Sequence, residues 1–410
     1  MRDDENTARC EITARSKSSR SKTKSQLKAE AKRKAYSVEV WYHGLLPRED
    51  VEKMLKKDGD YLVRTTKPEE DEKTKQVLTV LWEGAPHHFI IQETSKGDVY
   101  IKTYSFETIT QLVSFYADKK ICVTDKSGCK LLRPVIRESW ELLHTQVKRC
   151  KKLGEGAFGG VYSGELKYGR VTLPVAIKEA HFGDVLDKEQ IEEIMQEARI
   201  MRQYNHPNIV AFFGVAAQQQ PLLIVMELVE GSGLDGYLQK SGNKVTSKTK
   251  VKFSLDAAKG LEYLHRMNCL HRDIAARNCL IDAKQKVVKI SDFGLSRQVE
   301  AMKMEKDTRV PLRWLAPEIL TTKWYTRCSD VYGYGIMLWE IFSNGEQPFA
   351  DLDNRTIAKT VKKGGRPPLP SEMPTSMENI MKDCWNQEPS SRPTFTQVRK
   401  KLEVVLKIYK

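Results

Sequence analysis

A chain of 410 residues, 40% hydrophobic and 30% charged, has the size and composition of a protein with two or three globular domains, each with its own core. No run approaches the ~18 apolar residues of a membrane-spanning helix, the first residues form no apolar signal segment, and Arg2 excludes N-myristoylation. The eight cysteines show no Cys-x-x-Cys spacing, which argues against zinc fingers and a disulfide framework. We therefore expect a reduced, cytoplasmic protein without a membrane anchor.

The net charge of +14 is concentrated near the N-terminus. Residues 15–34 hold nine Lys and Arg against one acid, without aromatic residues, so we predict a disordered basic tail over residues 1–38. Three roles stay open for this tail: a solubilising arm, contact with an anionic membrane surface, or nuclear import through Lys32-Arg33-Lys34. The last two would add a peripheral membrane or nuclear fraction, and we expect no specific binding of nucleic acid.

A first folded module is predicted over residues 41–134. Apolar residues recur at helical spacing over residues 48–57 and 109–116, and β-type runs lie between them at 61–64, 77–82 and 88–92. This order predicts an antiparallel sheet flanked by two helices.

Arg64 ends the first of these strands, where the run Tyr61-Leu62-Val63 predicts a core position. A guanidinium is rarely buried without an anionic partner. Either Glu49 or Asp50 supplies that partner, or the anion arrives from outside as a phosphate held by the guanidinium fork.

Trp41-Tyr42-His43-Gly44, taken with Tyr61-Leu62-Val63-Arg64, resembles the Src-homology 2 (SH2) domain. The resemblance favours the external anion, because the matching Arg of that family binds phosphotyrosine. It also places Arg48, Thr66 and His88 in the same phosphate pocket. Thr65 departs from the usual Glu, which we expect to matter little.

A short linker is predicted over residues 135–146 and a second domain over 147–405. The linker is not rich in Gly or Ser, so we expect the two domains to touch. The run Leu153–Val161, with Gly154, Glu155, Gly156 and Gly159, is by itself compatible with an ordinary hairpin. Val175-Ala176-Ile177-Lys178 follows it, and the pair of motifs favours a loop whose N–H groups, with the Lys178 ammonium, hold nucleotide phosphates.

A helix is predicted over residues 188–203, with an apolar stripe that Glu197 borders. A carboxylate buried there without a partner would be costly. Lys178 is the predicted partner, and a solvated surface Glu is the alternative.

The strongest signal is His-Arg-Asp-Ile-Ala-Ala-Arg-Asn over residues 271–278, followed after a β-type run at 287–290 by Asp292-Phe293-Gly294. Phosphoryl transfer needs one carboxylate to orient a hydroxyl, and a carboxylate with an amide to hold a divalent metal. Asp273 fits the first role, and Asn278 with Asp292 the second. An exposed polar turn is the weaker alternative, because the spacing of the whole set is specific.

These motifs resemble those of the protein kinases. The resemblance implies an α+β, bilobal catalytic domain with a β-rich N-lobe and a helical C-lobe, which uses ATP and Mg²⁺, with Mn²⁺ as an alternative. Ala275 and Arg277 match the Ala-Ala-Arg-Asn form of the tyrosine kinases, as do Pro311 and Trp314. A strand is predicted over residues 222–229, followed by a hinge-like turn at 230–233. The resemblance places an adenine pocket here, formed by Leu153, Val161, Ala176, Met226, Glu227 and Val229. It also implies that Glu318 pairs with Arg392 and that Asp330 braces the catalytic loop.

The resemblance narrows to the Fes/Fer kinases on the runs at residues 196–200, 206–210 and 224–229, and it covers about nine-tenths of the chain. It implies a non-receptor tyrosine kinase that is recruited to phosphotyrosine proteins and activated when the SH2 module presses on the Glu197 helix. That family also carries a long N-terminal membrane-bending and coiled-coil region, of which we expect only the basic tail here. The rival interpretation is an SH2-dependent scaffold or pseudokinase, whose usual sign is loss of Lys178, Asp273 or Asp292.

No tyrosine lies between Asp292 and Glu318, and Met304 stands at the usual position of the phosphorylated tyrosine. We therefore predict that activity does not depend on autophosphorylation in this segment. Glu300 or Glu305 could serve as a permanent negative partner of Arg272, and Thr308 as a weaker phosphorylation site.

Overall fold

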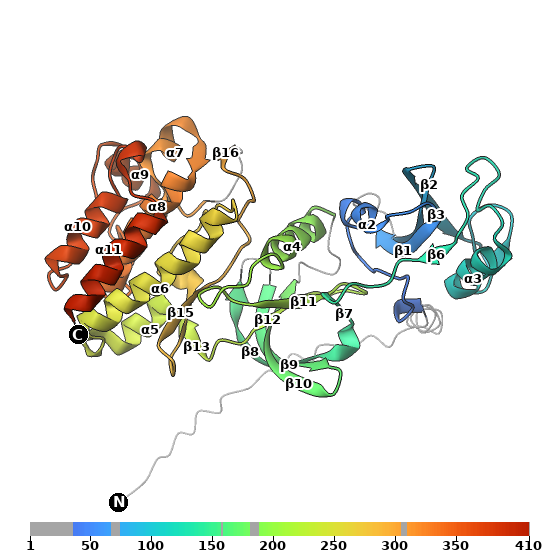
Figure 1. Ribbon diagram of the computed structural model, residues 1–410, viewed down its shortest axis with the longest axis horizontal. Coiled ribbons are helices and arrows are strands. Elements are labelled where there is room, and N and C mark those ends of the chain that lie inside the picture. Colours follow the sequence, from blue (N-terminus) through green and yellow to red (C-terminus); the bar gives the residue numbers. More distant parts are fainter. Residues whose placement is uncertain (1–35, 67–73, 157–158, 181–187, 305–309, 410) are drawn as a thin grey trace, which may run out of the picture.

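The computed structural model describes residues 36–66, 74–156, 159–180, 188–304 and 310–409. Figure 1 shows an N-terminal module of sheet and helices, a small β-rich lobe with one long helix, and a large helical lobe, arranged along the long axis. Residues 1–35 of the predicted basic tail lie outside the described residues, whereas the predicted disorder is wrong at residues 36–38, because Tyr36 is buried against Tyr42 in the core of the N-terminal module. Among the described residues, no helix is long and apolar enough to cross a bilayer.

The N-terminal module is a six-stranded sheet, in the order β5-β4-β3-β2-β1-β6, with α2 (Arg48–Met54) and α3 (Ile109–Lys119) beside it. Its core is apolar, with Leu78 and Leu112 fully buried between sheet and α3. Thr108 and Gln111 cap the start of α3 reciprocally. The strands are β1 (Asp60–Thr66), β2 (Lys75–Trp82), β3 (Ala85–Glu93), β4 (Val99–Tyr100), β5 (Ser105–Phe106) and β6 (Arg133–Pro134).

The small lobe is a second six-stranded sheet, ordered β7-β11-β12-β10-β9-β8, with α4 (Lys188–Met201) against it. Six of the fourteen residues of α4 are buried apolar side chains, and Glu197 is buried among them. The helix therefore needs a cation at that place in the sheet. The strands are β7 (Glu141–Leu142), β8 (Val147–Gly156), β9 (Gly159–Tyr168), β10 (Val171–Ala180), β11 (Phe212–Ala216) and β12 (Leu222–Glu227).

The large lobe is built around α8 (Arg327–Phe342), which is buried along its whole length from Ser329 onward. The other helices are α5 (Leu234–Ser241), α6 (Ser247–Arg266), α7 (Pro317–Thr322), α9 (Asn354–Lys362), α10 (Thr375–Cys384) and α11 (Phe395–Ile408). The short strands are β13 (Gly231–Gly233), β14 (Cys279–Asp282), β15 (Val287–Ile290), β16 (Ala301–Lys303) and β17 (Trp324–Thr326). The predicted α+β architecture with a β-rich and a helical lobe is confirmed.

The prediction of a turn at residues 230–233 is wrong in part, because Gly231–Gly233 forms β13 and pairs with β14. A side chain at Gly231 would place its Cβ 1.9 Å from the carbonyl oxygen of Ile281. Glycine is needed here for the close approach of two backbones rather than for a free turn.

The N-terminal module and the small lobe are in direct contact, as the short linker predicted (Figure 1). Leu45 N–H donates to the Ala217 carbonyl at 2.8 Å, and beside it Gly44 has φ +64° and no room for a Cβ, which would lie 2.1 Å from the same oxygen. On α4, Arg199 pairs with Glu49 and lies 3.5 Å from Asp50, both on α2. The helix that carries Glu197 is thus fastened to the N-terminal module.

Candidate functional site

Lys178 and Glu197 of the small lobe form a cation–carboxylate set with Asp292. Lys178, on β10, lies with its Nζ 2.8 Å from both carboxylate oxygens of Glu197 and 3.7 Å from Oδ1 of Asp292. Burial alone would lower the pKa of Lys178, but the two carboxylates outweigh it and the pKa is raised, so the ammonium stays charged. The alternative of a solvated Glu197 is wrong, since that side chain is 2% exposed.

The loop predicted to hold the nucleotide phosphates belongs to the hairpin of β8 and β9. Gly154 pairs with Val161 and Gly156 with Gly159, so glycines stand on both strands next to the tip of the hairpin. The hairpin tip at residues 157–158 lies outside the described residues. Ala176, on β10, is 8% exposed beneath the hairpin, and Leu153 is exposed at 53%.

The connection between the lobes offers backbone groups for a planar ligand. Gly231 N–H donates to the Val229 carbonyl at 2.9 Å, whereas the Val229 N–H makes no backbone hydrogen bond within the described ranges. The Glu227 side chain is turned away to Lys289, at 2.9 Å. The adenine contacts predicted for the backbone of Glu227 and Val229 stay a prediction, and Met226 is half-buried beside these residues.

The catalytic-loop residues Asp273, Arg277 and Asn278 lie together on the large-lobe side. Arg277 donates to Oδ1 of Asp273 and stacks over the ring of Trp314, with its guanidinium carbon 4.1 Å from the ring centre. Asn278 Nδ2 donates to the Asp273 backbone carbonyl at 2.8 Å. These two bonds use Oδ1 of Asp273 and Nδ2 of Asn278. The other carboxylate oxygen of Asp273 and the amide oxygen of Asn278 therefore remain available for ligands.

Asp330, on α8, binds the backbone of the catalytic loop. Its two oxygens accept the N–H groups of His271 and Arg272, each at 2.9 Å, and also the hydroxyl of Tyr325 at 2.7 Å. Burial opposes the charge, but these bonds and that from His265 outweigh it, and the pKa of Asp330 is lowered. Tyr332 is fully buried, and the guanidinium groups of Arg366 and Arg392 lie over its ring.

Glu340 is a site residue that the sequence reasoning missed. It is 3% exposed, and its Oε2 accepts both the Ala276 N–H of the catalytic loop and the indole N–H of Trp314, each at 2.9 Å. Burial raises the pKa of this carboxyl to about 7. The signal that could have found it is a lone acid inside the apolar run of α8, where a carboxylate needs buried donors.

The donor set suits a nucleotide-bound divalent cation. Asn278 and Asp292 offer two oxygen ligands, and Mg²⁺ in kinases is held by one or two protein oxygens together with substrate phosphates. No cluster of three His, Cys, Asp or Glu that could hold a metal by itself occurs in the part of the chain that the structure describes. A metal ion at this site would therefore need further oxygen ligands from the phosphates of the nucleotide.

The segment after Asp292 is held by strand pairing. Residues of β16 pair with β17, which follows α7, and Arg272 donates to the Leu295 carbonyl and lies over the Tyr325 ring. The prediction that Glu300 partners Arg272 is wrong, because Glu300 lies 3.7 Å from Arg327. Glu305 and Thr308 lie outside the described residues. The Glu318–Arg392 pair is present and bidentate, at 2.8 Å for each bond.

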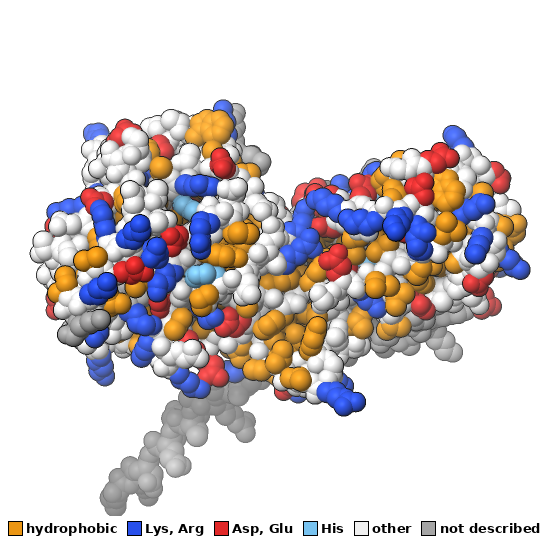
Figure 2. Space-filling view, viewed as in Figure 1, with side chains coloured by type: hydrophobic (Ala, Val, Ile, Leu, Met, Phe, Trp, Pro, Cys, Tyr) orange, Lys and Arg blue, Asp and Glu red, His pale blue; other side chains and the backbone are white. Residues whose placement is uncertain are grey.

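Arg64 lies on β1 at 8% exposure, and its Nε has no hydrogen-bond partner among the described residues. Glu49 and Asp50, the predicted internal partners, pair with Arg199 instead. A cavity of about 220 Å³ lies beside Arg64, lined by Arg48 and Thr66 and by Lys188 and Glu192 of α4, whereas the predicted ligand His88 is not among its lining residues. Lys and Arg side chains gather over this face of the module and reach its junction with the small lobe (Figure 2). Burial lowers the pKa of Arg64, and a bound anion would offset that cost.

Comparison with known proteins agrees with this geometry. A family model described as protein tyrosine and serine/threonine kinase matches residues 147–402, and an SH2 domain model matches residues 41–116. Human tyrosine-protein kinase Fer is 40% identical over 375 residues, which are 91% of this chain and 44% of that protein. Fer-related kinase 1 of Caenorhabditis elegans is 38% identical over 366 residues, 88% of this chain and 92% of that protein. The chain belongs to the SH2-containing tyrosine kinases of the Fer/Fps family.

The transforming protein Fps of avian sarcoma virus (strain PRCII) is a further relative of this tyrosine kinase, 40% identical over 378 residues, 90% of this chain and 68% of that protein. The chain spans less than half the length of human Fer. The family resemblance inferred from the motifs is thus confirmed over most of this chain.

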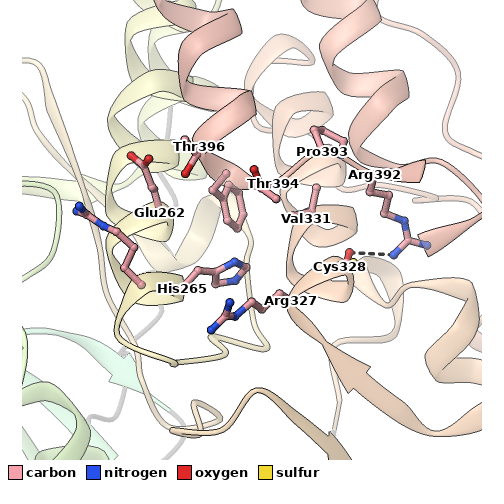
Figure 3. A pocket seen from close by; sticks show the side chains of 11 residues that line it. Glu262, His265, Arg327, Cys328, Val331, Arg392, Pro393, Thr394 and Thr396 are labelled. Carbon is pink, nitrogen blue, oxygen red and sulfur yellow. Dashed lines mark hydrogen bonds between the residues drawn. The ribbon is translucent and has the colours of Figure 1, made fainter. Parts of the chain in front are cut away.

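Another cavity, of about 240 Å³, lies in the large lobe, and neither Asp273 nor Asp292 lines it (Figure 3). Its lining includes His265, whose ring nitrogen lies 3.0 Å from Asp330, and Arg392, which donates to the Cys328 carbonyl at 2.9 Å. Since Arg392 is already neutralised by Glu318, we assign no ligand to this cavity and regard its wall as support for the catalytic loop.

Proposed function

We propose that this chain is an active tyrosine kinase that transfers the γ-phosphate of ATP to tyrosine hydroxyls of proteins, in the cytoplasm and with Mg²⁺ as the metal. The observation that carries the proposal is the complete Lys178–Glu197–Asp292 set, beside a catalytic loop in which Asp273 is paired with Arg277. A pseudokinase would be expected to lack one of these groups or to hold them apart. Here the cation is charged, buried and fixed by both oxygens of Glu197.

The chain's own residues support each part of the transfer. Lys178 neutralises and positions the ATP phosphates, and the bound divalent cation would supply further charge neutralisation. Asp273 accepts the hydroxyl proton as the tyrosine oxygen forms its bond to the γ-phosphorus and the bond to the ADP oxygen breaks. Arg277, fixed over Trp314, holds one oxygen of Asp273 and leaves the other for the hydroxyl.

Tyrosine specificity is tested with the full chain and labelled ATP. A peptide with one tyrosine is compared with the same peptide carrying Ser or Phe at that position. We expect incorporation into the tyrosine peptide alone. Equal labelling of the Ser peptide would contradict a tyrosine kinase, and no labelling of any peptide would favour the scaffold.

We further propose that the SH2 domain recruits the kinase to phosphotyrosine proteins and stabilises the active position of α4. Arg64, Arg48, Thr66 and His88 are the proposed phosphate ligands. The phosphate cavity is closed by the first turn of α4, and Arg199 of the same helix is fastened to α2. A ligand in the cavity therefore touches the helix that places Glu197. The solubilising, membrane and import roles of the basic tail remain proposals, and deletion of residues 1–35, which keeps the buried Tyr36, tests them.

A further inference from the structure

Glu52 is bonded to two of the proposed phosphate ligands, although neither Glu52 nor His88 lines the cavity beside Arg64. It lies on α2 one turn after Arg48, and its Oε1 accepts from Arg48 Nε at 2.6 Å and from His88 Nε2 at 3.0 Å. Two of the four proposed phosphate ligands are thus bound to a carboxylate of the same domain. One oxygen atom receives both bonds, which is the arrangement that a phosphate oxygen would have.

The partners of His88 decide which ring nitrogen carries the proton. Nδ1 lies 3.0 Å from the hydroxyl of Thr79, and Nε2 faces the Glu52 carboxylate, which can only accept. Burial lowers the pKa of His88, although the bond to Glu52 acts the other way. A neutral ring with its proton on Nε2 satisfies both contacts, and its single N–H then donates to Glu52.

Arg64 is in the opposite situation. Its Nε is buried and has no partner among the described residues, and no ion pair joins it to Glu52 in that part of the chain. The site therefore combines one guanidinium ready for an anion with two donors already in use. With His88 neutral, Arg48, Arg64 and Glu52 together carry one positive charge toward a phosphate that carries nearly two negative charges.

We infer that Glu52 is an affinity-setting residue of the phosphotyrosine site, an internal carboxylate that competes with the phosphate for Arg48 and His88. The inference rests on the proposed phosphotyrosine binding at Arg64. Phosphotyrosine enters by pairing with Arg64 and displacing Glu52 from its two donors. The Glu52 side chain is 31% exposed, so the released carboxylate can turn into water. Binding is weaker than the cationic ligands alone would give, which favours rapid exchange of partners.

Removing the competitor should tighten binding. Glu52→Gln keeps the shape of the side chain but removes the charge, and Glu52→Ala removes both. We expect both variants of the full chain to bind a phosphotyrosine peptide about two- to fivefold more tightly, the range expected for one partly exposed charge pair. The gain should be smaller for the same peptide with sulfotyrosine, because repulsion by Glu52 scales with the ligand's charge.

The experiment is isothermal titration calorimetry of the full chain with both peptides. Asp118→Asn, an exposed acid on α3, is the control for net charge and should leave both affinities unchanged. Weaker or equal phosphopeptide binding by both folded Glu52 variants would overturn the inference, and would mean that Glu52 only positions Arg48 and His88. Arg64→Lys tests the underlying proposal separately: if it bound like the unaltered chain, phosphotyrosine binding at Arg64 would itself be wrong.

Discussion

The buried carboxyl of Glu340 predicts a pH-dependent penalty on the stability of the kinase domain. Its pKa is raised by burial from 4.5 to about 7, and the side chain is 3% exposed, so solvent hardly screens it. Between pH 4.5 and about 7 the folded protein keeps a proton that the unfolded chain has released. Stability from this group therefore falls as the pH rises through that window, and the loss is complete above it.

The size of the penalty follows from the difference in pKa. At ~1.4 kcal/mol per pKa unit, the charged carboxylate costs the folded state about 3 kcal/mol at pH 8. Glu340→Gln keeps an oxygen that can accept from Ala276 and Trp314, and it carries no charge. We therefore expect the variant to be more stable than the unaltered chain at pH 8, by up to about 3 kcal/mol, and nearly equal to it at pH 5.

Urea unfolding of both proteins at pH 5, 6, 7 and 8 measures this difference. Glu346, which is exposed shortly after α8, provides the matched control, and Glu346→Gln should give a difference that does not change with pH. The reasoning would be refuted if the stability difference between Glu340→Gln and the unaltered chain were the same at pH 5 and pH 8. That result would mean that the buried carboxyl ionises as readily as a solvated one.

Three further predictions concern activity. Arg199→Ala should free α4 from α2 and lower turnover at least about fivefold, which corresponds to the lower end of a typical coupling energy. Calorimetry should show unchanged phosphopeptide binding by this variant. A loss of binding would mean that the substitution had damaged the SH2 domain itself. Lys178→Met should lower kcat/KM about 100-fold or more, because the cation acts on the ATP phosphates, and should also lower the melting temperature, because Glu197 is left buried without a cation; activity equal to the unaltered chain would refute the role given to Lys178. Treatment with a tyrosine-specific phosphatase, followed by its removal, should leave no lag in peptide phosphorylation, since no tyrosine lies between Asp292 and Glu318; a lag that shortens with enzyme concentration would show control by autophosphorylation elsewhere.

The sequence was sufficient where a motif carries its chemistry within a short run. The run 271–278 and Lys178 could be interpreted locally, because the spacing of their polar groups is set by one loop and one strand. The pairing of Lys178 with Glu197 was also predictable, since a carboxylate on an apolar helical stripe needs a cation.

Contacts between distant elements were not predictable in the same way. Glu49 and Asp50 were weighed as partners of Arg64, but they face Arg199, about 150 positions further along the chain. Glu52 reaches His88 across the module, and Glu340 reaches the catalytic loop from the far side of α8. Such pairs depend on how whole elements pack, which no local spacing encodes. The strand at Gly231–Gly233 was missed for the same reason, because its partner β14 lies some 50 residues later.

The most direct test of the account is phosphate transfer by the full chain and by its Asp273→Asn variant. Both are given labelled ATP, Mg²⁺ and a poly-Glu/Tyr polymer, and nucleotide binding is measured alongside. The account predicts that the unaltered chain labels tyrosine, and that Asp273→Asn binds ATP nearly as well but transfers phosphate at least about 100-fold more slowly, the range expected for loss of a general base. Equal transfer by the two proteins, or none by the unaltered chain, would contradict it.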